Sequence, residues 1–197
     1  MSDLILLEDC QEEFQYELLS EDKKGEYYIR GVFAKAGIRN RNGRFYPMDV
    51  MEESVTGAQD LIRSNGFVGE LDHPPTPKIN VEKISHKITA LEMAKDGNVI
   101  GEMKVLDTDY GKILKKLIDE EVRLGVSTRG LGKLTQDNTL GESVLKVNPG
   151  FRLKAIDVVF DPSAGTYPDM VSESFEEKII LGGTKKFSEV WEEVFGG

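Results

Sequence analysis

The sequence contains a single cysteine, Cys10, and only two histidines, His73 and His86. One cysteine cannot close an intramolecular disulfide, which is typical of a protein that works in a reducing cytoplasm. So few thiol and imidazole groups also argue against a structural zinc site. We therefore expect a chain that folds without disulfides, metal ions or cofactors.

Long apolar runs and an excess of basic residues are absent as well. No run approaches the length of a membrane-spanning helix, and the start of the chain lacks the basic segment that opens a signal peptide. The net charge of -10 argues against nucleic-acid or anionic-membrane partners. The 197 residues, 39% hydrophobic and 30% charged, have the composition of one soluble globular domain.

The spacing of apolar and turn-forming residues predicts an α+β fold that is mainly β. Runs of β-forming residues predict strands at 27–34, 84–93, 98–106, 125–134, 142–147 and 151–160. Helical periodicity and capping residues predict helices over about 47–64, 108–122 and 188–195. The acidic start of the chain and the segment after the glycine pair at 182–183 are expected to be extensions of this domain.

Three separate segments each hold one candidate catalytic group. His73 precedes two prolines, which restrict the backbone and disfavour a helix there. Ser127 lies in a strand or turn with glycines on both sides, where the backbone can approach a substrate closely. Asp157 lies in an apolar run, and a buried carboxylate requires a donor such as an imidazole N–H. A serine, a histidine and a buried carboxylate are the groups that acyl transfer on serine requires.

Each candidate also has a plainer interpretation. Ser127 lacks the Gly-x-Ser-x-Gly pattern of α/β-hydrolases and could be an ordinary turn residue. Asp157 could form a structural salt bridge. His86 falls in a predicted strand beside apolar residues, and we expect it to be a packed, hydrogen-bonded histidine rather than the base.

Four segments in the same order carry a family resemblance. They are NRNGRFYP at 40–47, GELDHPP at 69–75, GVSTRGLG at 125–132, and the stretch from Asp157 through the PSA at 162–164. Together they resemble the prohead (procapsid) maturation proteases of tailed phages, in particular the T-even prohead core proteases. The resemblance covers roughly residues 26–165 of the chain.

The resemblance implies a serine endopeptidase with the fold of the herpesvirus assemblin proteases, a closed β-barrel flanked by helices. The family histidine falls on His73 and the nucleophile falls on Ser127. In the herpesvirus proteases the third member is a second histidine, whereas the corresponding strand here carries Asp157. The chain therefore resembles a Ser-His-Asp version of the family.

The resemblance also suggests where the substrate oxyanion is bound. By analogy with the loop after the third triad residue, we expect backbone N–H groups at Ser163, Ala164 or Gly165 to bind it. Arg129 is a candidate to assist there or to meet an acidic substrate side chain. The alternative for Arg129 is a structural ion pair.

The implied substrates are phage scaffold or core proteins, the major capsid protein and the chain itself, cut after Glu in Leu/Ile-x-Glu sequences. The chain holds such triplets at 6–8, 19–21, 118–120 and 140–142, and the predicted helix should protect 118–120. We expect a homo-oligomer inside the prohead, which assembles in the bacterial host cytoplasm.

The expected organisation is an N-terminal arm (1–24), a protease domain (25–175) and a C-terminal tail (176–197). Either end could cover the groove near Ser127 and be removed on activation, or could pack as an ordinary edge strand or helix. Two other functions stay open at this point. One is a non-catalytic capsid or scaffold component of the same fold, and the other is a metal-dependent hydrolase that uses Glu70, Asp72 and His73.

Overall fold

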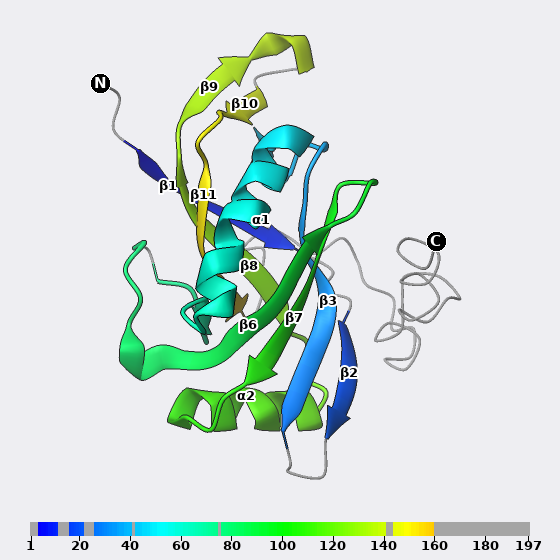
Figure 1. Cartoon of the computed structure of the whole chain (residues 1–197), viewed down its shortest axis with the longest axis vertical. Coiled ribbons are helices and arrows are strands. Elements are labelled where there is room, and N and C mark those ends of the chain that lie inside the picture. Colours follow the sequence, from blue (N-terminus) through cyan, green and yellow to red (C-terminus); the bar gives the residue numbers. More distant parts are fainter. Residues whose placement is uncertain are drawn as a thin grey trace.

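The computed structural model describes residues 4–11, 16–21, 26–40, 42–74, 76–140 and 144–159, which form three β-sheets and two α-helices (Figure 1). The mainly β character that we predicted is confirmed. The helix predicted at 188–195 and the expected tail at 176–197 lie outside the described residues.

The largest sheet has five antiparallel strands in the order β2-β3-β7-β6-β5. Their bounds are Tyr16–Glu21, Tyr27–Lys35, Asn98–Val105, Ile84–Met93 and Val68–Glu70, in that order. The strands predicted at 84–93 and 98–106 form a hairpin that turns at Gly97, whose φ of 89° suits glycine. The short strand β5 ends this sheet, and the segment that carries His73 begins directly after it.

A second sheet has three antiparallel strands in the order β1-β8-β11, with bounds Ile5–Gln11, Gly125–Gly132 and Arg152–Val159. A small third sheet joins β4, β10 and β9, with bounds Arg44–Phe45, Val144–Val147 and Leu134–Asp137. The strand predicted at 125–134 is confirmed as β8, which ends at Gly132, and a separate strand, β9, begins at Leu134. Two short 3-10 helices, Val81–Lys83 (η1) and Asn138–Leu140 (η2), complete the described elements.

The closed barrel that the resemblance implied is not confirmed, because none of the three sheets closes within the described residues. The two larger sheets instead meet along the short edge strand β5. Leu71 forms a parallel bridge with Val158 of β11, and the N–H of Asp72 donates to the Val158 carbonyl at 2.8 Å. This seam places the end of β5 beside the C-terminal end of β11, an edge strand of the three-stranded sheet.

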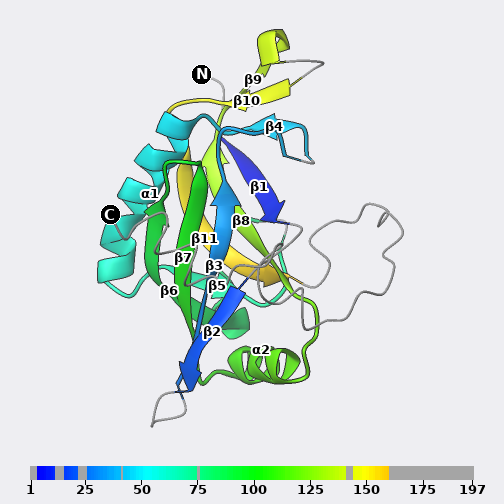
Figure 2. The same ribbon diagram turned by 90° about the vertical axis from the view of Figure 1, so that its right-hand side faces the viewer.

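Helix α1 (Met48–Arg63) packs its apolar side against β6 and β11 (Figures 1 and 2). It starts after Pro47 and stops at Asn65, whose φ of 56° does not continue a helix. No helix in the described part of the chain is long and apolar enough to cross a membrane.

Helix α2 (Asp109–Asp119) lies below the ends of β6 and β7 (Figures 1 and 2). The Thr108 hydroxyl caps it by accepting from the Gly111 N–H at 3.0 Å. The helix ends three residues before the predicted Val122, because Glu121 adopts a φ of 55°.

The segment expected to be an arm contributes two strands to these sheets. β1 pairs along β8, and its Leu7 is 0% exposed within the core. β2 pairs with β3 at the edge of the five-stranded sheet. Removal of this segment on activation stays a prediction. In the structure the segment forms paired strands rather than a loose extension.

Candidate active site

Ser127 and Asp157 lie directly opposite one another on adjacent strands of the second sheet. The register pairs Ser127 of β8 with Asp157 of β11, and directly opposed residues of antiparallel strands point to the same face. Both residues are 0% exposed. Of the two settings expected for Ser127, a strand or a turn, the strand is confirmed, because Ser127 is the third residue of the eight in β8.

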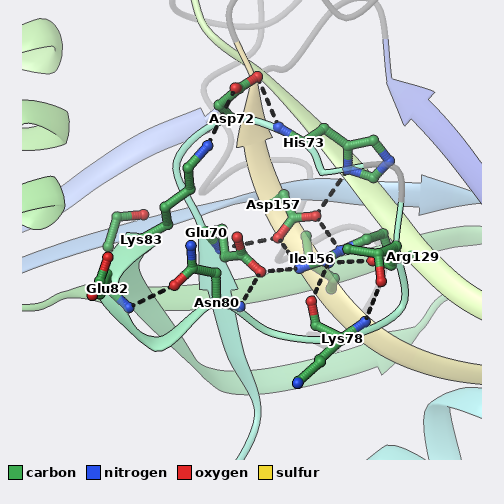
Figure 3. Close-up of polar contacts among 12 residues, drawn as sticks. Glu70, Asp72, His73, Lys78, Asn80, Glu82, Lys83, Arg129, Ile156 and Asp157 are labelled. Carbon is green, nitrogen blue, oxygen red and sulfur yellow. Dashed lines mark hydrogen bonds and ion pairs between the residues drawn. The ribbon is translucent and has the colours of Figure 1, made fainter.

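His73 reaches this face through a sharp turn after β5. Asp72 adopts a φ of 73°, and its carboxylate accepts from the His73 N–H at 2.9 Å. The turn directs the imidazole towards β11, where Nδ1 lies 2.9 Å from Oδ2 of Asp157 (Figure 3). Because an ionised carboxylate only accepts hydrogen bonds, Nδ1 carries the proton and the lone pair belongs to Nε2.

The Asp157 carboxylate has a full set of donors. Besides His73, the Glu70 backbone N–H donates to Oδ1 at 2.9 Å, and Nη2 of Arg129 donates to the same atom at 2.9 Å. Nε of Arg129 lies 2.6 Å from Oδ2 as a close ion pair without hydrogen-bond geometry. Together these contacts fix the orientation of the Asp157 side chain towards His73.

Arg129 is fully buried, and its guanidinium is turned towards carboxylates rather than solvent (Figure 3). It also binds Oε1 of Glu70 at 2.9 Å and the Thr76 carbonyl at 2.8 Å. Of the two roles expected for Arg129, the structure therefore shows the structural ion pair. Direct contact with an acidic substrate side chain would require this side chain to leave both carboxylates.

The metal alternative required Glu70, Asp72 and His73 to converge, and they do not. The Glu70 side chain is 0% exposed and faces Arg129, whereas the Asp72 side chain is 80% exposed and lies 3.8 Å from Nζ of Lys83. The positive φ at Asp72 breaks the strand alternation that would have put both carboxylates on one face. Among the described residues, no cluster of three metal-binding side chains is found.

His86 is a packed histidine, as expected. It is 0% exposed in β6, its Nε2 donates to the Ile156 carbonyl at 2.9 Å, and its Nδ1 lies 2.9 Å from the Ser85 hydroxyl. Burial lowers the pKa of His86 to about 4, against the opposing effects of the Ile156 carbonyl and the Asp157 charge. His86 is therefore neutral near pH 7 and has both ring nitrogens occupied.

Sequence reasoning missed Gly69, which allows three elements to meet here. A Cβ at this position would lie 1.9 Å from the Ile156 carbonyl oxygen and 2.2 Å from Nε2 of His86. Only glycine lets β5 approach both groups. The glycine before Glu70 in the GELDHPP segment was the available signal. Ser163, Ala164 and Gly165 lie outside the described residues, so the oxyanion site stays a prediction.

The profile of a family described as prohead core protein serine protease matches residues 14–176. The chain belongs to this family. The resemblance that rested on four short segments is thereby confirmed across most of the chain.

Two relatives support the assignment. The chain is 37% identical over 144 residues to the prohead core protein protease of Enterobacteria phage T4, a match that covers 70% of this chain and 65% of that protein. It also resembles the solved structure of the bacteriophage T4 capsid assembly protease, gp21, with a TM-score of 0.70 and 28% identity. That match covers 80% of this chain and 99% of the solved chain.

Proposed function

We propose that this chain is a serine endopeptidase of phage capsid maturation, in which Ser127 is the nucleophile, His73 the general base and Asp157 the orienting carboxylate. The observation that carries the proposal is the 2.9 Å contact between Nδ1 of His73 and Oδ2 of Asp157, on the strand position paired with Ser127. Membership of a prohead protease family supports the substrate class.

The chemistry follows from the roles of these groups. Nε2 of His73 takes the hydroxyl proton of Ser127 as Oγ attacks the peptide carbonyl carbon, and the imidazolium is stabilised by Asp157. The same nitrogen then gives the proton to the leaving amine, which leaves an acyl-enzyme. Water repeats the sequence to release the acid. Backbone N–H groups at Ser163, Ala164 or Gly165 bind the oxyanion.

The substrates are scaffold or core proteins and the major capsid protein, cut after Glu in Leu/Ile-x-Glu sequences inside the prohead. The names of the T4 relatives, a prohead core protein protease and a capsid assembly protease, support this substrate class and location. Self-cleavage at 118–120 is disfavoured, because residues 118 and 119 belong to α2 and a protease binds an extended chain. The enzyme works as a homo-oligomer.

Before activation, β1 occupies the edge of β8 beside the nucleophile. Cys10 pairs with Ser127 and Glu8 pairs with Arg129, so a Leu-Leu-Glu sequence lies in an extended strand at this edge. An extended substrate could pair with β8 there only after β1 has left. The residues that match the family profile begin after β1, which supports its role as a removable segment. We propose the same removal on activation for the tail at 176–197, and there the argument comes from the sequence alone.

Truncation tests this control. A version that lacks residues 1–13 loses β1 but keeps β2, and one that lacks 1–24 loses both strands. On a Leu-x-Glu peptide we expect the shorter truncation to cleave on the order of ten-fold faster than the full chain, because a tethered strand competes at millimolar effective concentration. A version that lacks 184–197 tests the tail in the same assay. Truncated proteins that fold normally and are no faster would reject self-inhibition.

Co-expression tests the proposed function itself. The chain is expressed with the scaffold and major capsid proteins of its own phage, and fragment masses are compared with those from Ser127→Ala. We expect cuts after Glu that disappear in the variant. Uncut partners in both samples would favour the non-catalytic capsid component, and cuts mainly after basic or aromatic residues would overturn the proposed specificity.

A further inference from the structure

We propose that Arg129 and Glu70 are positioning residues for the His73–Asp157 pair. Arg129 holds the loop that carries His73, and the Glu70 carboxylate balances the positive charge of Arg129. The inference rests on the proposed function and adds two residues to it. Both side chains are fully buried, and neither needs to touch the substrate to act.

The first role is mechanical. The single guanidinium of Arg129 joins three segments: Asp157 on β11, Glu70 at the end of β5, and the Thr76 carbonyl in the loop after His73. Glu70 adds a fourth link, because its Oε1 also accepts from the Asn80 N–H at 3.0 Å. The ion pair between Arg129 and Glu70 thus holds the loop at Thr76 and again at Asn80.

The composition of the loop explains why it needs such a brace. Prolines stand at 74, 75 and 77, and proline has no backbone N–H to donate. The loop therefore has few N–H donors for its own carbonyls, and the Thr76 carbonyl takes its donor from Arg129 instead. Arg129 supplies several donors in a rigid plane, which a lysine in its place could not do.

The second role is electrostatic. Two carboxylates, Glu70 and Asp157, surround one guanidinium, so the formal charge of the cluster is minus one with a neutral His73 and zero with an imidazolium. The buried cluster is therefore neutral at the step where His73 holds the serine proton. Without Glu70, Arg129 would cancel the charge of Asp157, and the protonated state would carry an unbalanced buried charge.

Other charged groups near His73 in the described residues contribute less. Asp72 and Lys83 form a pair at the rim, and their side chains are 80% and 32% exposed. Lys78 is exposed and offers only its carbonyl to Arg129. His86 contacts the neighbouring Ile156 carbonyl and is neutral above about pH 4. Glu70 is thus the buried charge, besides Asp157 and Arg129, that sets the balance.

The test measures the titration of His73 directly, by NMR on the full chain in a Ser127→Ala background that cannot digest itself. The chain has only two histidines, and His86 does not titrate near neutral pH, so the remaining imidazole signal is His73. Glu70→Gln removes one negative charge and keeps the amide oxygen for Arg129. We expect the titration midpoint of His73 to fall by about one pH unit. Glu82→Gln, the same change at an exposed position of η1, should leave it unchanged.

A second variant separates charge from bracing, and its titration midpoint is compared with that of the parent, so this comparison does not require Glu70→Gln to fold on its own. Glu70→Gln/Arg129→Met restores the formal charge of minus one, so the midpoint should return to the parent value. With Ser127 intact, this double variant should still cleave at least about ten-fold more slowly in kcat than Glu70→Gln, because the brace is lost. A midpoint that ignores Glu70→Gln, or that fails to return in the double variant, would overturn the proposal. Neither of these two His73 midpoints depends on whether the chain is a protease.

Discussion

The two histidines of this chain contact consecutive residues of the same strand and are built for different tasks. His86 donates to the Ile156 carbonyl, and His73 lies against the Asp157 carboxylate. The His86 ring is fully buried between two neutral partners, whereas the His73 side chain is 16% exposed and faces a charged one. A histidine becomes a useful base when an anion stabilises its protonated form and one edge of the ring stays near the surface.

The elements that carry the two rings explain the difference. β6 lies between two neighbours in the five-stranded sheet, so a side chain on its inner face is enclosed. His73 follows the short edge strand β5, where the chain can turn across the seam towards β11. The same residue type is thus a structural hydrogen-bonding group in the sheet interior and a candidate catalyst at the sheet edge.

The strongest test of this difference between the two histidines is to remove each imidazole in turn. His73→Ala should reduce cleavage of a Leu-x-Glu peptide by about 10⁶-fold, as should Ser127→Ala, because the two act as one unit. Both variants should keep the fold. His86→Gln is the matched control, and its folded fraction should cleave within about ten-fold of the parent, since it removes no group from the reaction. The measurement is kcat/KM alongside circular dichroism.

The next effect in size comes from the partner of His73. Asp157→Asn should lower kcat by about 10⁴-fold, because an amide N–H facing Nδ1 favours the wrong imidazole tautomer. The contact between His86 and the Ile156 carbonyl is untouched by this change. If Asp157→Asn left the rate intact while His86→Ala abolished it, the third catalytic role would belong to His86.

Much of this contrast was visible in the sequence. The apolar run around Asp157 predicted its burial, and the predicted strand around His86 indicated a packed ring. The helix starts predicted at 47 and 108 each lie one residue before the observed starts of α1 and α2. These features depend on residues that are close together in the chain, so local patterns are enough to reveal them.

The missing parts depend on contacts between distant segments. The ion pair between Glu70 and Arg129 joins residues 59 positions apart, and no local pattern specifies it. The turn at Asp72 depends on a positive φ at a non-glycine residue, which the seam with Val158 supports. The order of the three sheets, and the pairing of β1 with the strand of Ser127, likewise follow from long-range packing.

The smallest expected effect concerns stability and pH. Burial lowers the pKa of His86 in the folded chain to about 4, below its ordinary value of 6.5, so the unfolded chain binds a proton more readily. The free energy of unfolding should therefore be highest above pH 6.5 and fall by roughly 3 kcal/mol as the pH drops from about 6.5 to about 4. Urea unfolding across this range measures it, on the Ser127→Ala protein.

The control for that prediction is His86→Gln, which should be less stable at pH 7 but should lose this part of the pH dependence. An unchanged slope in the variant would mean that another group causes the loss.

Active-site labelling tests the central claim most directly. A fluorophosphonate should modify the full chain, or the version that lacks residues 1–13, at one position, and peptide mass mapping should place the adduct on Ser127. Labelling should be lost in His73→Ala and retained in His86→Gln. An adduct on another residue, or labelling of Ser127 that depends on His86 rather than His73, would contradict the account.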